Sequence, residues 1–157
     1  MPIGNVAFKY AYRDASNYKL HGEAVFTNQS LLRLDEIEKQ IRICTRDGLF
    51  FIARQVHIEE RFFDILHDDD HPWHEFETVD ETTEVAFDPA NWKEHGYYRD
   101  IVEFLAELHR ARHAGWDEMN VRPDMLRLLE RQKTELKRRY LEGEDILSDA
   151  PRIRKME

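Results

Sequence analysis

The segment HDDDHPWHEF, residues 67–76, is the densest run of potential metal ligands in this chain of 157 residues. Its histidine and carboxylate side chains supply the nitrogen and oxygen donors that zinc, manganese and iron accept. A loop that folds these donors around one divalent ion would belong to a metal-dependent hydrolase or to a nuclease accessory. The predicted ligands are His67, Asp70, His71 and His74.

The spacing of these donors does not require a metal site. Pro72 interrupts any helix and favours an extended backbone at the residue before it, which is typical of a loop that leads into a strand. The alternative is a hydrated acidic loop whose charges contact a partner. In that case we expect the partner to meet Asp68, Asp69, Glu75 and Glu77, together with Arg13 and Lys19 from the turn-rich segment 12–19.

Two other patterns carry less weight. His109 and His113 have the i, i+4 spacing of helical metal ligands, but two arginines lie between them and no glutamate follows the first histidine. Asp124 and the Glu135-Leu136-Lys137 triplet match the text of a nuclease motif. Along one helix, however, those carboxylates would be about 16 Å apart, too far to share an ion. P-loop, dinucleotide-binding and serine-hydrolase motifs are absent from the sequence.

The charge is unevenly distributed along the chain. The formal net charge of −9 belongs entirely to residues 1–90, and residues 59–88 hold twelve acids against one arginine. The last predicted helix is basic, so it can pair with the acidic segment, with a second copy of the chain or with nucleic acid. Missing aromatic interleaving disfavours nucleic acid. The cations concerned include Arg131, Lys137, Arg138 and Arg139.

Hydrophobic periodicity predicts an α+β fold with a small antiparallel sheet in the order β-β-α-β-β and one packed helix. Residues 5–13 and 18–26 alternate as two strands of a hairpin, and residues 34–44 have helical spacing. The segment LFFIARQVHI (49–58) is apolar on both faces at first, which predicts a central strand. WHEFETV (73–79) is the predicted last strand.

The composition changes after residue 90. Two amphipathic helices are predicted, one ending near Gly115 and one starting at Pro123. We therefore expect an acidic α+β domain at 1–90, a helical extension at 91–143 and a loose tail at 144–157. The single cysteine, Cys44, excludes a disulfide framework. An N-terminus without a signal peptide and a chain without a long apolar run predict a cytoplasmic protein with no membrane partner.

Three passages resemble a group of small uncharacterised bacterial proteins: KYAYRDASNYK, DEIEKQIRICTRDGLFFIARQV and HPWHEF. The resemblance covers about the first 80 residues. It implies that this part is a self-standing module and assigns no activity to any residue.

These features favour a non-enzymatic protein-interaction module: a regulator, inhibitor or assembly subunit that acts through an acidic surface. A role in bacterial defence or counter-defence would suit such a module. The expected partner is a protein, either basic or a second copy of the chain. A divalent metal at residues 67–75 and nucleic-acid binding by the last helix remain the alternatives.

Overall fold

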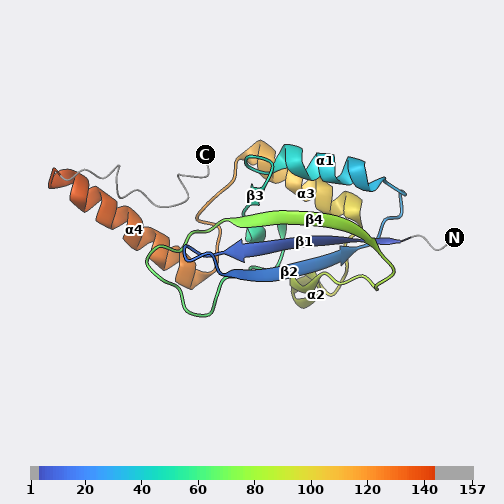
Figure 1. Cartoon of the computed structure of the whole chain (residues 1–157), viewed down its shortest axis with the longest axis horizontal. Helices are drawn as coiled ribbons and strands as arrows, with labels where there is room; N and C mark the ends of the chain where they lie inside the picture. The colour runs from blue at the N-terminus through green and yellow to red at the C-terminus, as the bar shows by residue number, and fades with distance from the viewer. Residues whose placement is uncertain (1–3, 144–157) are drawn as a thin grey trace.

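The computed structural model describes residues 4–143, except for the side chains of residues 93–95. Four strands form one sheet in the order β2-β1-β4-β3, and each neighbouring pair is antiparallel. This confirms the predicted α+β fold and its β-β-α-β-β order (Figure 1). The strands are β1 (Asn5–Arg13), β2 (Lys19–Phe26), β3 (Phe50–Phe51) and β4 (His74–Thr82).

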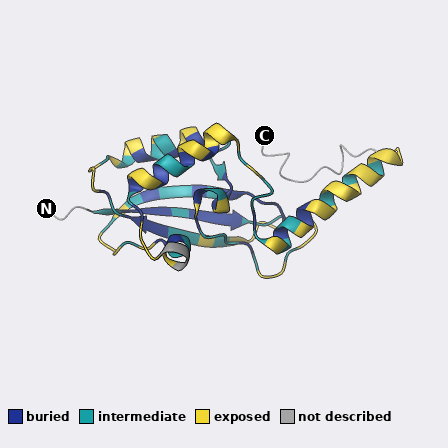
Figure 2. Cartoon of the chain, turned by 180° about the vertical axis from the view of Figure 1, so that it is seen from behind, coloured by how far each residue is buried: buried dark blue, intermediate teal, exposed yellow. Residues whose placement is uncertain are grey.

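Two helices cover one face of this sheet. Helices α1 and α3 lie side by side against what we call the inner face, and the opposite face is called the outer face (Figures 1 and 2). A short 3-10 helix, η1, follows β3. The bounds are α1 (Leu34–Cys44), η1 (Ala53–Val56), α2 (Pro89–His95), α3 (Ile101–Ala114) and α4 (Pro123–Leu141).

The β1–β2 hairpin closes through the side chain of Asp14. Its Oδ1 accepts hydrogen bonds from the backbone N–H groups of Ser16 at 3.0 Å and Tyr18 at 2.9 Å. Asn17 takes a left-handed backbone conformation with φ of 71°, which asparagine tolerates better than most residues. The turn sets a register in which Arg13 lies opposite Lys19.

Gly22 is required by the packing of the hairpin. A Cβ atom at this position would lie 2.3 Å from Cζ of Tyr10, whose ring crosses over β2 on the inner face. The Tyr10 hydroxyl then donates a hydrogen bond to the Glu59 carbonyl at 2.5 Å. Because Gly22 has no side chain, the Tyr10 ring of β1 can lie directly over β2.

Two hydrophobic clusters form the core. The first joins the inner face of the sheet to α1 and α3, and it includes Phe8, Phe26, Ile37, Ile41, Ile101, Phe104 and Leu108. The second lies at the end of the sheet where β1 finishes and β4 begins. It includes Tyr12, Ile52, Phe62, Trp73, Met125, Leu128 and Leu129.

Helix α3 begins with a capping box in which the Asp100 side chain and Glu103 satisfy each other's backbone N–H groups.

The expectation of a central strand at residues 49–58 is wrong. Only Phe50 and Phe51 are paired, and they form the edge strand next to β4. The segment is apolar on both faces because it passes between the two clusters. Phe51 belongs to the first cluster, whereas Ile52 belongs to the second.

The two predicted C-terminal helices exist, but they pack differently. Helix α3 shares the first cluster with the sheet, so the core continues across the boundary expected near residue 90, which falls inside α2. Helix α4 buries Met125, Leu128 and Leu129, and its later turns extend away from the sheet (Figure 1). The tail expected at 144–157 lies outside the described residues. Among the described residues, no helix is both long and apolar enough to cross a membrane.

Candidate protein-interaction surface

The turn at residues 67–71 is anchored from inside by Asp70. The Tyr12 hydroxyl donates a hydrogen bond to Asp70 Oδ1, and the backbone N–H of His67 donates to Oδ2 at 2.7 Å. The Asp70 side chain is buried. Burial, followed by the hydrogen bond to Asp70, raises the pKa of Tyr12 far above its usual value. Asp70 therefore acts as the internal support of this turn.

His71 and His74 are both buried and already hydrogen-bonded. His71 Nδ1 accepts from the Trp73 backbone N–H at 3.1 Å, so its Nε2 donates to the Arg13 carbonyl at 2.8 Å. His74 Nε2 accepts from the Arg61 backbone N–H at 2.8 Å. Burial is the main cause that lowers the pKa of both rings, and it takes the pKa of His74 to about 3. Both imidazoles are neutral at pH 7.

The four predicted metal ligands are not brought together as one ligand set. His67 is exposed, whereas Asp70, His71 and His74 are buried and bonded to separate protein groups. Nowhere in residues 4–143, side chains 93–95 aside, do three His, Cys, Asp or Glu side chains lie in an arrangement that suits a metal ion. The lone pairs that a metal would need at His71 Nδ1 and His74 Nε2 already accept backbone N–H groups.

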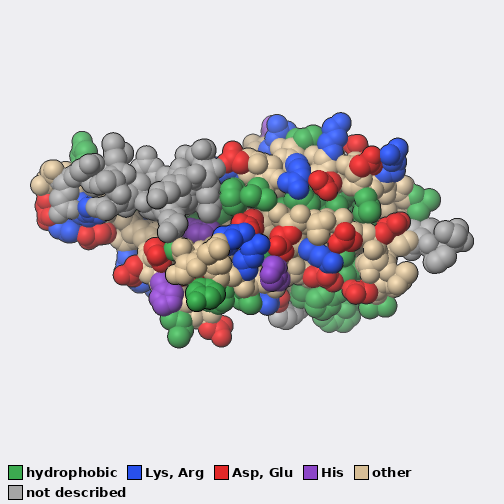
Figure 3. Space-filling view, viewed as in Figure 1, with side chains coloured by type: hydrophobic (Ala, Val, Ile, Leu, Met, Phe, Trp, Pro, Cys, Tyr) green, Lys and Arg blue, Asp and Glu red, His purple; other side chains and the backbone are tan. Residues whose placement is uncertain are grey.

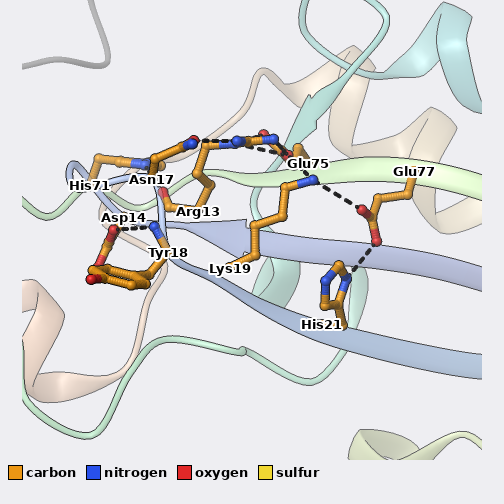
Figure 4. Close-up of polar contacts among 9 residues, drawn as sticks. All are labelled: Arg13, Asp14, Asn17, Tyr18, Lys19, His21, His71, Glu75 and Glu77. Atoms are coloured by element: carbon orange, nitrogen blue, oxygen red, sulfur yellow. Dashed lines mark hydrogen bonds and ion pairs between the residues drawn. The ribbon is translucent and has the colours of Figure 1, made fainter.

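A charged network does assemble on the outer face, where β2, β1 and β4 lie next to one another (Figure 4). Arg13 Nη2 lies 2.9 Å from Glu75 Oε1. Lys19 Nζ lies between Glu75 at 3.8 Å and Glu77 at 3.4 Å, and His21 Nδ1 is 2.9 Å from Glu77 Oε1. Four of the six predicted partner-binding residues thus meet, and they bind one another.

This network shields the sheet from solvent. Beneath it, Ala11 is fully buried even though it belongs to the outer face, opposite both His21 and Glu75. Ion pairs between partly exposed groups contribute little stability. Here the ion pairs balance the charges of the long side chains that cover the small Ala11 side chain. The other two predicted contacts, Asp68 and Asp69, are exposed on the anchored turn and are not part of the network.

The basic helix meets the acidic turn through hydrogen bonds. Gln132 Nε2 donates to the backbone carbonyls of Asp68 at 2.7 Å and Asp70 at 3.0 Å. Within α4, Arg138 pairs with Glu135 of its own helix at 2.6 Å. Of the four predicted cations, Arg131, Lys137 and Arg138 are exposed and Arg139 is half-buried.

A feature that hydrophobic periodicity did not indicate is an apolar ledge beside the edge of β2. Five of the twelve exposed large hydrophobic side chains among the described residues fall within residues 85–98. Figure 3 shows hydrophobic side chains gathered along the sheet margin where α2 lies in Figure 1. We define the apolar ledge as Val85, Phe87, Trp92, Tyr97 and Tyr98, which are 81, 51, 52, 43 and 39% exposed.

The ledge has a defined shape. The rings of Trp92 and Tyr98 stack with their centroids 4.8 Å apart and their planes within 8°. Phe87 is bonded to Val25 of β2 by two backbone hydrogen bonds of 2.7 and 2.9 Å, which attach the start of the ledge to the sheet. The backbone of Phe87 is therefore held against the edge of β2.

A buried ion pair closes the loop that carries the ledge. Arg99 Nε lies 2.8 Å from Asp88 Oδ2, and both side chains are almost completely buried. Arg99 also donates to the backbone carbonyls of Val56 at 2.9 Å and His57 at 2.7 Å. Asn91 adds hydrogen bonds to His57 and Asp88. This clamp holds both ends of the loop against η1.

The signal for the ledge was present in the sequence as composition. The segment VAFDPANWKEHGYY, residues 85–98, is rich in aromatic residues but has neither strand nor helix periodicity. Hydrophobic periodicity detects side chains that face the core. It therefore does not detect a segment whose apolar side chains face solvent.

Comparisons of this chain with protein-family models, with curated proteins and with solved structures find no match. The resemblance of the first 80 residues to small bacterial proteins stays a prediction. The arguments for function below therefore start from the geometry of the chain itself.

Proposed function

We propose that this protein is a non-enzymatic protein-interaction module, a regulator, inhibitor or assembly subunit, and that the apolar ledge is its main contact surface. The observation that carries the proposal is the exposure of five large apolar side chains within residues 85–98. Large exposed apolar patches mark sites of protein contact. Fully burying one such side chain contributes roughly 1.5–3 kcal/mol, so a partner that covers several of them gains substantial affinity.

The clamp below the ledge supports the same proposal. A buried ion pair is expensive to desolvate and adds little net stability over apolar packing. Asp88 and Arg99 nevertheless form such a pair, and the stacked rings of Trp92 and Tyr98 lie within the loop that the pair closes. Presentation of rigid aromatic anchors lowers the entropy lost when a partner binds.

The metal-dependent alternative has weaker support. It needs several donors with free lone pairs directed at one ion, whereas His71 and His74 use theirs for backbone N–H groups. The nucleic-acid alternative relies on α4, where Arg131 and Lys137 are exposed. Helix α4 exposes one aromatic ring, Tyr140, whereas a platform for single-stranded bases uses several. The other candidate rings lie in the ledge, and Glu84 directly precedes its first residue, Val85. An acidic group there repels phosphates.

The proposal is tested by site-specific photo-cross-linking in cells that produce the protein. A photoreactive amino acid replaces Trp92 or Phe87 of the ledge, and it replaces Ile43 of α1 in the control, where exposure is a similar 43%. We expect a discrete protein adduct from the two ledge positions and none from position 43. An adduct of twice the chain mass identifies a second copy as the partner.

Two results would contradict the proposal. The same adducts at all three positions would mean that the cross-links report collisions rather than docking. No adduct at either ledge position, with the protein folded and abundant, would mean that the ledge meets no protein in the cell.

A further inference from the structure

Three carboxylates and one lysine gather on the outer face beside the ledge. Lys9 of β1 lies opposite Glu23 of β2, and its Nζ is 3.2 Å from Oδ2 of Asp80 on β4. Glu84, just after β4, acts electrostatically on both Lys9 and Glu23. Lys9 faces all three carboxylates. Its single positive charge offsets only part of their negative charge.

The position of Glu84 is fixed by its own backbone. Its carbonyl accepts a hydrogen bond from Asn5 Nδ2 at 2.8 Å, and its N–H donates to Thr82 Oγ1 at 3.1 Å. Partial burial is the first cause that raises the pKa of Glu23, and the nearby carboxylate of Glu84 is the second. The fold therefore holds the carboxyl groups of Glu23 and Glu84 close together.

These carboxylates are continuous with the apolar ledge. Glu23 and Val25 are two residues apart on β2 and share the outer face. Val25 pairs with Phe87, the first aromatic ring of the ledge, and Val85 directly follows Glu84. The three carboxylates and the apolar ledge are therefore neighbours at the margin of the sheet.

We infer that the partner docks through a short segment that carries a lysine or arginine beside an apolar anchor. The anchor packs on the apolar ledge, and the cation binds among Glu23, Asp80 and Glu84. Lys9 competes with that cation from within the protein. The inference rests on the proposed function and adds the chemistry of the partner, because opposite charges across an interface select partners and speed association.

The test uses three synthetic peptides of equal length, each with one leucine and one tryptophan. They differ at two positions, which are both lysine, both glutamine or both glutamate. Affinity is measured by calorimetry at low salt, and the indole N–H resonance of Trp92 reports whether the peptide reaches the ledge. We expect the lysine peptide to bind roughly tenfold more tightly than the glutamate peptide, and the difference to shrink at high salt.

Variants separate the charge from the ledge. Glu84→Gln should reduce the preference for the lysine peptide severalfold, whereas Lys9→Gln should increase it. Glu130→Gln, an exposed acid on α4, is the matched control and should leave the preference unchanged. Trp92→Ser should weaken all three peptides together, because it removes the anchor and not the charge.

Equal affinities of the lysine and glutamate peptides would overturn the inference. So would a preference that Glu84→Gln leaves intact, or the absence of binding by every peptide at millimolar concentration. None of these peptide results would remove the ledge cross-links in cells. The cross-linking therefore tests the proposed function, and the peptides test the chemistry of the partner independently.

Discussion

Arg99 and Asp88 form a nearly solvent-free ion pair in which the guanidinium also bonds two backbone carbonyls and lies over the rings of Phe26 and Phe104. The pair joins two residues that are eleven positions apart in the sequence and lie on either side of α2. The Asp88–Arg99 ion pair therefore connects the core, the η1 segment and the loop that carries the apolar ledge.

Removing one partner of this pair should destabilise the whole fold. Asp88→Ala leaves the Arg99 charge buried without a counter-ion, and breaking a buried pair in this way costs about 3–5 kcal/mol. Urea unfolding followed by circular dichroism measures the loss. The control is Arg33→Ala, which breaks the exposed pair with Asp35 and should change stability by less than about 1 kcal/mol. Similar losses in the two variants would contradict a structural role for the clamp.

The internal support of the 67–71 turn gives a second prediction. Tyr12→Phe removes the hydroxyl that donates to Asp70 and leaves a buried carboxylate oxygen without that donor. The expected loss is about 1–3 kcal/mol in the free energy of unfolding. Tyr18→Phe makes the same chemical change at a side chain that is 70% exposed, and it should be neutral. Equal stability of the Tyr12 variant and the wild type would argue against the bond.

Acid should destabilise the protein through its buried histidines. The pKa of His74 falls from 6.5 in the unfolded chain to about 3 when folded, and the pKa of His71 is also lowered. Between pH 6.5 and 3 the unfolded state therefore binds more protons, so stability falls as the pH falls. The slope from His74 approaches about 1.4 kcal/mol per pH unit, and the lowered pKa of His71 acts in the same direction.

Urea titrations at several pH values between 7 and 4 measure this slope. His74→Gln keeps an acceptor for the Arg61 backbone N–H but cannot take up the proton. It should make the pH dependence shallower. Parallel curves for the wild type and His74→Gln would show that another group controls the acid response.

Metal content distinguishes the proposed function from its metal-dependent alternative. With the histidine lone pairs engaged, we expect less than one equivalent of any transition metal in the purified, tag-free protein. His71→Ala and His74→Ala should not change that value. Elemental analysis of the three proteins is the measurement. A stoichiometric metal that both variants lose would make residues 67–75 an active-site candidate and would overturn the non-enzymatic proposal.

Much of the fold was predictable because its signals are local. The alternation in residues 5–13 and 18–26 and the helical spacing from Leu34 to Cys44 follow from which side chains each element must bury. Pro123 marked the start of α4, because proline is suited to a first helical turn. Such patterns depend on periodicity within one segment and need no knowledge of its neighbours.

Tertiary structure decided the features that depend on distant partners. The apolar run at Phe50 and Phe51 became a sheet edge, because two clusters bury it from opposite sides. The donors of residues 67–75 became structural supports when Tyr12, Arg13 and Arg61 supplied their hydrogen bonds from elsewhere in the chain.

The sequence by itself determined the β1–β2 hairpin, the main helices and the concentration of acids, because each depends on residue type and spacing along the chain. Only the folded chain could create the apolar ledge, since the packing of residues 85–98 against the rest of the chain decides which of their side chains stay exposed. Only the sheet register could bring Glu23, Asp80 and Glu84 around Lys9. Burial and charge contact are properties of pairs of segments, and a linear pattern does not contain them.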